Sequence, residues 1–349
     1  MPDIHCLLLA GSYTESERER VVNAAGAREV IEAEPADARA VDRGLSRADV
    51  AALPGDLPEA AFTSGKLRWA HCGHAGVERS ARPELFERGV RLSSAAGRSA
   101  LVLPEHPLFC ILSLTYGARR LLRAQDDRSS DLVRAETLRA LKGQTLGVIG
   151  LGHTGSALAV RAGALGLRVV GYRRRARPLP AGVEHVWALD AGDTVHPLLE
   201  TSDFVVLAAS LNDGSHGLLD TAAFAAMKPG ARLINVARGA LVDEPALVRA
   251  LQEEHLAGAG LDTFAVEPLP ASSPLWDLPN VLITPHQTPP LPEREDRALE
   301  ILCENLRRYR RGEPLRNELT AEDAYSAGLP ARPDGWLQRL RRRLVRLGR

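Results

Sequence analysis

The sequence has little of several residue types, and each shortage argues against a class of protein. Aromatic residues make up only 4% of the 349 residues, which is few for the stacking surfaces that bind single-stranded nucleic acid. Lys+Arg and Asp+Glu both number 44, so there is no net charge to attract nucleic acid or an anionic membrane. No apolar run approaches the roughly 20 residues that span a bilayer. We therefore expect neither a nucleic-acid nor a membrane partner.

Cysteines and metal-ligand patterns are equally sparse. The four cysteines lie far apart in the sequence, at Cys6, Cys72, Cys110 and Cys303. Because no pair has the C-x-x-C spacing, we expect reduced thiols in a cytoplasmic protein. His71 and His74 have no third ligand in view, so we expect no metal site. The N-terminus has an early acidic residue and only a short apolar stretch, which we interpret as a strand and a helix rather than a signal peptide.

What the sequence does contain is a regular alternation of short apolar runs and helical patterns. The runs predict strands at 4–10, 67–71, 90–94, 145–150, 168–172, 204–209, 231–237, 258–264 and 280–285. Helices are expected at 103–125, from the glycines after 149 to about 165, and at 294–312. Residues 50–66 give no clear strand pattern. Near-continuous apolar strands separated by helices predict an α/β fold with parallel sheets covered on both faces.

A glycine pattern, "GLGHTG", follows the apolar run 145–149 and opens a helix. Gly150, Gly152 and Gly155 have the G-x-G-x-x-G spacing of dinucleotide-binding loops. The first glycine permits a tight turn, the second lets the backbone approach a pyrophosphate, and the third lets the helix pack on the strand. The N–H groups of His153 and Thr154 would point at the phosphate from the helix N-terminus. The alternative is a glycine-rich turn that packs and binds nothing.

The next strand, 168–172, ends in arginines. Where an NAD-binding fold carries an acid about 20 residues beyond the glycines, to accept from the ribose 2′-OH, this chain has Arg173 followed by Arg174 and Arg175. Guanidinium groups suit a 2′-phosphate through charge-assisted hydrogen bonds. We therefore expect Arg173, with Arg174, to bind NADP. The alternatives are a solvated basic turn, and NAD as the cofactor.

Three further residues follow strands at the edge where open α/β sheets bind ligands. Arg238 ends the buried run "LINVA", and its guanidinium would match a carboxylate. Glu267 and His286 follow the next two strands. A histidine passes protons near neutral pH, and a neighbouring carboxylate fixes its tautomer. Taken singly, each residue has an ordinary loop or turn interpretation; their shared edge, beside a phosphate loop, favours an active site.

At this point the chain resembles the D-isomer-specific 2-hydroxyacid dehydrogenases. The resemblance is carried by "LRWAHCGHAGVE", "GLGHTG", "INVARGALVDE", "LDTFAVEPLP" and "SPLWDLPNVLITPH", in that order over roughly residues 65–315. It implies that Arg238 binds the substrate carboxylate and carbonyl, and that Glu267 pairs with His286 as the acid/base. It also implies that the backbone at Ala75 and Gly76 binds the substrate carboxylate, and that Asp262 contacts the nicotinamide carboxamide.

The full set of expected cofactor contacts follows from the glycine loop, the arginines and the resemblance. These residues are Gly150, Gly152, His153, Thr154, Gly155, Arg173, Arg174, Val236, Ala237 and Asp262. The expected fold has two Rossmann-like domains with doubly wound parallel sheets. A flavodoxin-like substrate domain would comprise 1–102 completed by 290–320, and the dinucleotide-binding domain would comprise 103–289. Helices 103–125 and 294–312 would cross at the hinge, and 321–349 would form a peripheral C-terminal tail.

The expected activity is hydride transfer between NADPH, or NADH, and a small 2-oxo acid such as glyoxylate or hydroxypyruvate. The alternative is a non-catalytic NAD(P)-sensing binding protein of the same fold. The resemblance also implies a homodimer formed through the nucleotide domain. The basic end "RLRRRLVRLGR" is interpreted as a solvated helix or frayed end, with a membrane or acidic partner as the alternative.

Overall fold

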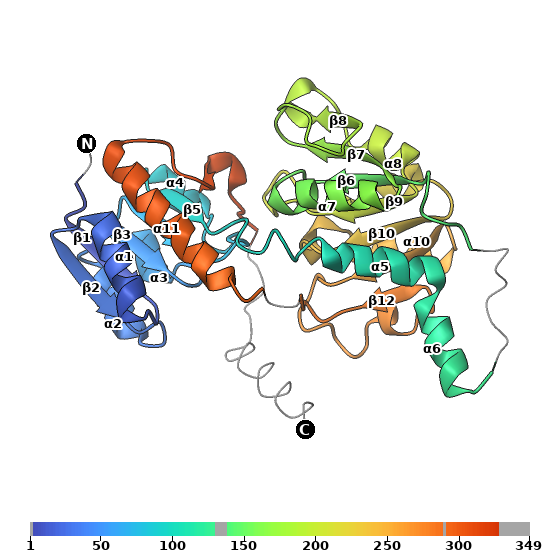
Figure 1. Ribbon diagram of the computed structural model, residues 1–349, viewed down its shortest axis with the longest axis horizontal. Coiled ribbons are helices and arrows are strands. Elements are labelled where there is room, and N and C mark those ends of the chain that lie inside the picture. Colours follow the sequence, from blue (N-terminus) through green and yellow to red (C-terminus); the bar gives the residue numbers. More distant parts are fainter. Residues whose placement is uncertain (1–2, 130–137, 289–290, 328–349) are drawn as a thin grey trace.

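Two sheets, each covered by helices, make up the protein in the computed structural model, which describes residues 3–129, 138–288 and 291–327 (Figure 1). The α/β class with parallel sheets is thus confirmed. Within the described residues, no helix combines the length and the apolar character needed to cross a bilayer.

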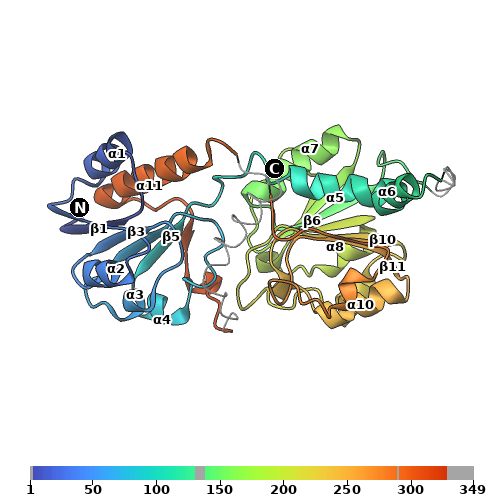
Figure 2. The same cartoon turned by 90° about the horizontal axis from the view of Figure 1, so that it is seen from below.

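The first sheet is six-stranded within the described residues, in the order β13-β5-β4-β3-β1-β2. Its strands are β1 Cys6–Ala10, β2 Glu29–Ala33, β3 Val50–Leu53, β4 Trp69–Cys72, β5 Arg91–Ser94 and β13 Glu318–Leu319. All pairs are parallel except β13 with β5. Its helices are α1 Glu15–Ala25, α2 Ala38–Leu45, α3 Glu59–Thr63, α4 Pro83–Glu87 and α11 Arg294–Arg311. Figure 2 shows α1 and α11 on one face and α2, α3 and α4 on the other.

The second sheet is seven-stranded within the described residues and entirely parallel, in the order β12-β11-β10-β9-β6-β7-β8. Its strands are β6 Thr145–Ile149, β7 Arg168–Arg173, β8 His185–Ala188, β9 Phe204–Leu207, β10 Ala231–Asn235, β11 Leu256–Leu261 and β12 Val281–Ile283. Its helices are α5 Glu105–Tyr116, α6 Ala118–Asp126, α7 His153–Ala164, α8 His196–Thr201, α9 Thr221–Ala226 and α10 Glu244–Gln252. Short 3-10 turns lie at Leu189–Ala191, Gly239–Leu241, Pro274–Trp276 and Ala321–Asp323.

Strands that are rich in valine, leucine and isoleucine were mostly predictable, and strands with charged residues or several alanines were not. The nine predicted strands all exist, with ends that differ by a few residues. The sequence analysis missed four strands: β2, β3, β8 and β13. The edge strand β2 has two glutamates among five residues and no regular alternation, and β3 is half alanine, a residue with low strand propensity. These strands form because they pair with neighbouring strands of the sheet, and a local sequence pattern does not show this pairing.

The expected single helix 103–125 is two helices, α5 and α6. Gly117 separates them in the left-handed conformation, with φ of 63°, and its N–H bonds to the Ser113 carbonyl. A left-handed glycine is a common helix end, because it lacks the Cβ that makes this conformation costly. The helix therefore breaks at Gly117, and the amphipathic pattern, which continues across this glycine, did not predict the break.

The described part of the expected peripheral tail is packed into the protein. Ala324 and Tyr325 are only 6% and 5% exposed, and Tyr325 lies in the apolar core of the second sheet. The burial of these two side chains offsets the cost of ordering the segment. The basic stretch 339–349 lies outside the described residues.

Candidate active site

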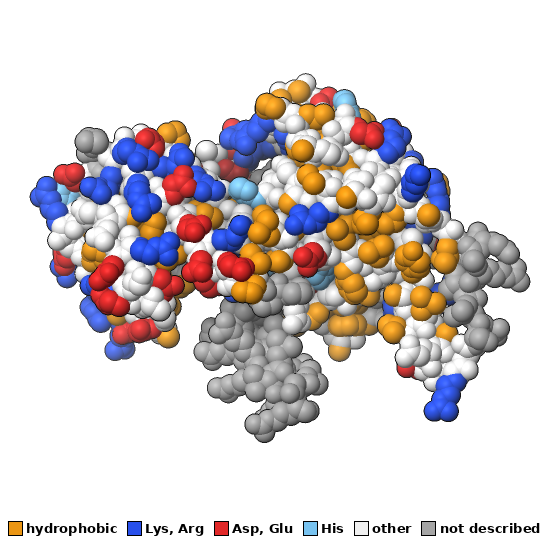
Figure 3. All heavy atoms as spheres, in the orientation of Figure 1, with side chains coloured by type: hydrophobic (Ala, Val, Ile, Leu, Met, Phe, Trp, Pro, Cys, Tyr) orange, Lys and Arg blue, Asp and Glu red, His pale blue; other side chains and the backbone are white. Residues whose placement is uncertain are grey.

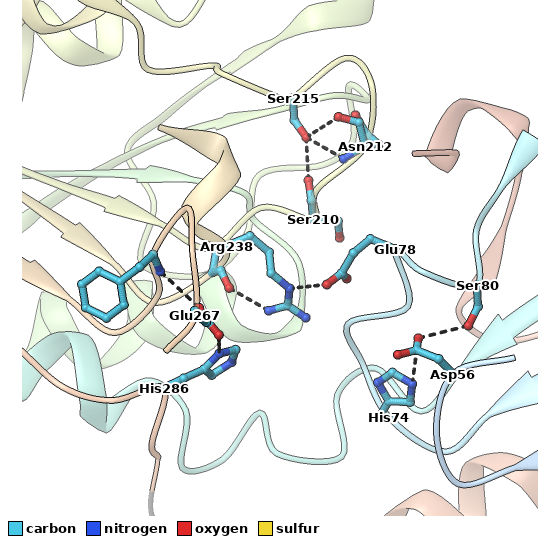
Figure 4. A network of polar contacts seen from close by, with 12 residues as sticks. Asp56, His74, Glu78, Ser80, Ser210, Asn212, Ser215, Arg238, Glu267 and His286 are labelled. Carbon is cyan, nitrogen blue, oxygen red and sulfur yellow. Dashed lines mark hydrogen bonds and ion pairs between the residues drawn. The ribbon is translucent and has the colours of Figure 1, made fainter. Parts of the chain in front are cut away.

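Arg238 lies between the two sheets and is held by both. It follows β10 of the second sheet, and its Nε donates to Glu78 Oε1 at 2.7 Å, from the loop after β4 of the first sheet (Figure 4). Its Nη1 donates to the carbonyl of Ala237 at 2.7 Å. Nη2 has no hydrogen-bond partner among the described residues and lies against Gly76.

The Arg238–Glu78 pair is electrostatically coupled and mostly removed from water, with side-chain exposures of 25% and 6%. Burial disfavours the charge of Arg238, but the Glu78 carboxylate outweighs that cost and keeps the Arg238 pKa above its ordinary value. Burial likewise disfavours the charge of Glu78, yet the guanidinium holds the Glu78 pKa below its ordinary value. Both groups are therefore charged at neutral pH.

Gly76 lies directly against the Arg238 guanidinium. A Cβ at position 76 would stand 1.3 Å from Nη2, so only glycine fits beside the arginine in this arrangement. The preceding Ala75 is exposed. The structure thus brings the "AGV" loop of the first sheet to the arginine of the second, as a substrate site shared by both would require.

His286 and Glu267 form a hydrogen-bonded pair in the same region. His286 Nδ1 lies 2.8 Å from Glu267 Oε2, and the other carboxylate oxygen, Oε1, accepts from the Phe264 N–H at 3.1 Å. Figure 4 shows this pair beside Arg238, and Glu267 contributes to the charge balance of Arg238. If Nδ1 carries the proton, as a carboxylate partner favours, Nε2 is the atom that can exchange a proton with a ligand.

His286 is held in a conformation that side chains rarely adopt, with φ of 51°. Asp262 stabilises this loop, because its Oδ1 accepts from Gln287 N at 2.9 Å and from Thr284 Oγ1 at 2.7 Å. His106 Nε2 lies 2.9 Å from the same Thr284 hydroxyl. The Asp262 carboxylate, expected to contact a cofactor, is therefore bonded to the loop that carries His286.

The glycine loop has the geometry that its spacing predicts. Gly150 has φ of 99°, and a Cβ on Gly155 would stand 1.9 Å from the Gly150 carbonyl oxygen, so strand β6 and helix α7 approach as only glycine permits. In contrast, a Cβ on Gly152 would meet nothing within 4 Å. The space in front of the loop is therefore open toward the start of α7, where His153 and Thr154 lie.

The arginines after β7 are arranged differently from one another. Arg173 Nη2 bonds to the carbonyl of Pro178 at 3.3 Å, and its buried Nε has no partner in the described part of the chain. Arg174 is bound instead to acidic residues that follow α11: its Nη2 donates to Asp323 Oδ1 at 2.7 Å. Arg175 donates to Glu322 Oε2 at 2.9 Å. Arg173 and Arg174, expected to act together, thus have different environments.

These features fit a dinucleotide. The open space at Gly152, the N-terminus of α7 and the unpartnered Nε of Arg173 supply a phosphate cradle and a donor without an acceptor. Val236 and Ala237 lie in the chain between the end of β10 and Arg238. Residues at both ends of the site are thus available to hold the two halves of the cofactor.

The two histidines of the "HCGH" stretch serve other contacts. His71 Nδ1 lies 2.9 Å from Ser93 Oγ, and burial lowers the His71 pKa to about 3, so the ring is neutral. His74 Nε2 lies 3.5 Å from Asp56 Oδ1. Across residues 3–129, 138–288 and 291–327, no three His, Cys, Asp or Glu side chains cluster as ligands for a metal ion.

Sequence reasoning missed two residues that organise the arginine. Glu78 carries the charge that meets Arg238. Asn235 closes the turn before Arg238: its Nδ2 donates to the Arg238 carbonyl at 2.9 Å, and its Oδ1 accepts from Ala237 N at 3.0 Å. Both residues lie inside the quoted motifs "HCGHAGVE" and "INVARG". An acid six positions after a buried strand was the available signal for Glu78.

The fold and the site define a class: a dinucleotide-binding α/β protein with an anion-binding arginine and a histidine–carboxylate pair. The model of the "D-isomer specific 2-hydroxyacid dehydrogenase, NAD binding domain" family matches residues 109–288. The chain therefore belongs to the D-isomer specific 2-hydroxyacid dehydrogenase family, which confirms the resemblance.

Individual relatives agree with this assignment. A glyoxylate reductase from Korarchaeum cryptofilum is 40% identical over 49% of this chain and 50% of that protein. An (S)-sulfolactate dehydrogenase from Chromohalobacter salexigens is 35% identical over 64% of this chain and 71% of that protein. The match thus spans about half of the first relative and more of the second.

A solved structure covers nearly the whole chain. The D-isomer specific 2-hydroxyacid dehydrogenase from Xanthobacter autotrophicus Py2, in complex with NADPH and MES, superposes with a TM-score of 0.75 at 29% identity. The alignment covers 92% of this chain and 100% of that one. The two-domain α/β fold with Rossmann-like sheets is thereby confirmed.

We predict that Gly155→Ala weakens dinucleotide binding by tenfold or more and lowers the thermal unfolding midpoint, because the new Cβ would collide with the Gly150 carbonyl 1.9 Å away. Gly163→Ala, in the same helix α7, is the matched control, since a Cβ there meets nothing within 4 Å. Fluorescence titration with NAD+ and NADP+ measures the affinities. Equal affinities in the two variants would contradict the close approach of loop and helix.

Proposed function

We propose that this protein is an NAD(P)-dependent reductase of small 2-oxo acids, a D-2-hydroxyacid dehydrogenase whose substrates resemble glyoxylate or hydroxypyruvate. The observation that carries the proposal is the 2.8 Å His286–Glu267 pair beside Arg238. A proton donor and an anion clamp at the end of a dinucleotide site are what reduction of a 2-oxo acid needs. The names of the glyoxylate reductase and the sulfolactate dehydrogenase relatives support the same reaction class.

Arg238 would hold the substrate. Its Nε edge is occupied by Glu78, so the Nη2 edge faces the substrate carboxylate and the adjoining carbonyl oxygen. The backbone at Ala75 and Gly76, packed against that edge, would supply N–H donors to the same carboxylate. Positioning the carbonyl and stabilising the charge that develops on its oxygen both lower the barrier.

His286 would donate the proton. A bound nicotinamide would supply the hydride to the carbonyl carbon. Protonated His286, with Nδ1 on Glu267 Oε2, then presents Nε2–H to the carbonyl oxygen. Glu267 stabilises the imidazolium and is itself oriented by the Phe264 N–H. Asp262, bonded to the loop on either side of His286, keeps the ring in place.

For the cofactor we propose a preference for NADP over NAD. The support is Arg173 at the end of β7, where an acid would favour the ribose hydroxyl, and its buried Nε without a partner among the described residues. The Xanthobacter relative was solved with NADPH. Phosphate contacts would come from the backbone of Gly152, His153 and Thr154.

The alternative function, a non-catalytic NAD(P) sensor, would need the nucleotide site but not the proton donor. The intact set of Arg238, Glu267 and His286 favours an enzyme, because a sensor has no use for a hydrogen-bonded acid/base pair beside an anion clamp. The test is an assay in which the protein is mixed with NADPH and glyoxylate or hydroxypyruvate, and the loss of NADPH absorbance measures turnover. Tight NADPH binding without turnover of any 2-oxo acid would favour the sensor.

We propose that residues 1–102 and 290–320 form the substrate domain and 103–289 the dinucleotide domain. This division is supported by the two sheets and by the packing of α11 on α1. Four buried free thiols fit the reducing cytoplasm.

We also propose a homodimer formed through α5 and α6. These helices expose several large apolar side chains, which contribute to the apolar surface over the nucleotide-binding unit in Figure 3: Phe109, Leu112, Tyr116, Leu121 and Leu122. Exposed apolar patches of this kind mark association surfaces, and a second copy would cover this one. Light scattering in solution measures the mass.

Arg238→Lys is expected to lower kcat/KM for the 2-oxo acid by about 100-fold or more, with cofactor affinity nearly unchanged, because a lysine keeps the charge but loses the planar fork. Arg308→Lys on α11, an arginine paired with Glu304 away from the site, is the control. Steady-state kinetics at saturating NADPH provide the measurement. Wild-type kinetics for Arg238→Lys would remove this residue from substrate binding.

Glu267→Gln is expected to shift the pH dependence of reduction to lower pH. Reduction needs the protonated imidazole, so activity is lost as the pH rises. Without an anionic partner the imidazolium is less stable, so that loss begins at a lower pH. Glu304→Gln on α11 should leave the profile in place, and His286→Ala should lower kcat by about 10²–10⁴-fold in the pH range where the unmutated protein is active. An unmoved profile in Glu267→Gln would show that the 2.8 Å contact does not couple these residues in catalysis.

Arg173→Ala is expected to raise the KM for NADPH by about 10–100-fold and to leave the KM for NADH almost unchanged, because charge-assisted bonds to the 2′-phosphate are lost. Arg168→Ala is the matched control: it lies at the opposite end of β7 and pairs with Glu184. The ratio of kcat/KM for the two cofactors decides the preference. A wild-type ratio that favours NADH would overturn the NADP assignment and leave the reductase proposal standing.

A further inference from the structure

The described chain after α11, residues 312–327, returns across the molecule to the edge of the proposed dinucleotide site. Asn317 begins this return: its Nδ2 donates to the carbonyls of Ser94 and Ala96 at 3.1 and 2.8 Å, in the first sheet unit. Its Oδ1 lies 3.1 Å from Nε2 of His153, the first residue of α7 in the second unit. One side chain thus contacts both units beside the glycine loop.

Residues 320–326, here termed the crossing segment, continue over the second unit. The Ala324 carbonyl accepts from Asp213 N at 3.0 Å, and Ser326 N donates to Asp213 Oδ1 at 2.8 Å, in the loop after β9. Tyr325 is buried in the core of the second unit, while its N–H donates to the Ala81 carbonyl of the first at 2.8 Å. The segment therefore lies along the carboxyl edge between β7 and β9, where the adenosine half of a dinucleotide binds.

Two carboxylates of the crossing segment bind the arginines after β7. Arg174 Nη2 donates to Asp323 Oδ1 at 2.7 Å, and its Nη1 donates to the Glu322 carbonyl at 3.0 Å. Arg174 Nε lies 4.0 Å from Glu322 Oε2, and Arg175 Nη2 donates to that same oxygen at 2.9 Å. Acceptors of the crossing segment surround the Arg174 guanidinium.

We propose that Glu322 and Asp323 set the cofactor preference of this protein by competing with the NADP 2′-phosphate for Arg174 and Arg175. This inference rests on the proposed use of NAD(P). A phosphate and these carboxylates need the same donors, so Arg174 and Arg175 can reach the phosphate only by releasing the crossing segment. NAD has a hydroxyl at this position and leaves the ion pairs intact. The preference that Arg173 confers is thus reduced by acids contributed from far along the chain.

The test is the affinity of the full chain for NADP+ and for NAD+, measured by isothermal titration calorimetry, which does not depend on turnover. In Glu322→Gln/Asp323→Asn both amides keep a hydrogen-bonding oxygen, so the Thr320–Asp323 capping contact can persist. Exposed ion pairs are weak, so we expect the Kd for NADP+ to fall about five- to tenfold and that for NAD+ to stay within about twofold. Glu322→Gln alone, which leaves the cap untouched, should give part of the effect.

Glu313→Gln is the matched control. Glu313 pairs with Arg311 shortly before the crossing segment, so this substitution removes one negative charge from the same region without touching Arg174 or Arg175. An unchanged NADP+ affinity in the double variant would overturn the inference. So would weaker NADP+ binding, which would mean that the acids hold the arginines in place for the phosphate. The protein could bind both nucleotides and show the expected fall in the Kd for NADP+ in the double variant, yet have no reductase activity. That outcome would support the inference and contradict the proposed function. No binding of either nucleotide would overturn both.

Discussion

A buried guanidinium must meet an anion, and in this protein that requirement joins the two halves of the chain. Arg238 follows a strand of the second sheet, and its partner Glu78 follows a strand of the first. An unpaired charge at this depth would cost several kcal/mol. The pair therefore fixes how the two loops face each other, and it holds the Arg238 guanidinium near the His286–Glu267 pair (Figure 4).

The same constraint acts at the other end of the site. Arg174 and Arg175 follow β7, and their carboxylate partners come from the segment after α11. These pairs are more exposed than Arg238–Glu78, so they are weaker and can exchange for another anion. The Arg238–Glu78 pair is therefore the more firmly held of these contacts, and the pairs of Arg174 and Arg175 exchange more easily.

Local patterns predicted the elements that are locally specified. Strands such as β6 and β10 are largely apolar, and the glycine loop between β6 and α7 has a spacing that sterics demand, because a Cβ on Gly155 would stand 1.9 Å from the Gly150 carbonyl oxygen. The sequence did not predict the edge strand β2 or the helix break at Gly117. Strand β2 forms because it pairs with β1, and the break depends on the left-handed backbone conformation of one residue. Periodicity carries no record of either.

The sequence by itself determined the fold class, the glycine loop and the strand-end position of Arg238, Glu267 and His286, because each follows from residues close together in the chain. Only the tertiary structure decided which charges meet. Glu78 and Arg238 are 160 positions apart, and Arg174 and Asp323 are 149 apart. Electrostatic attraction acts through space, so the partner of a charge is set by how strands and helices pack, and no local pattern in the sequence states it.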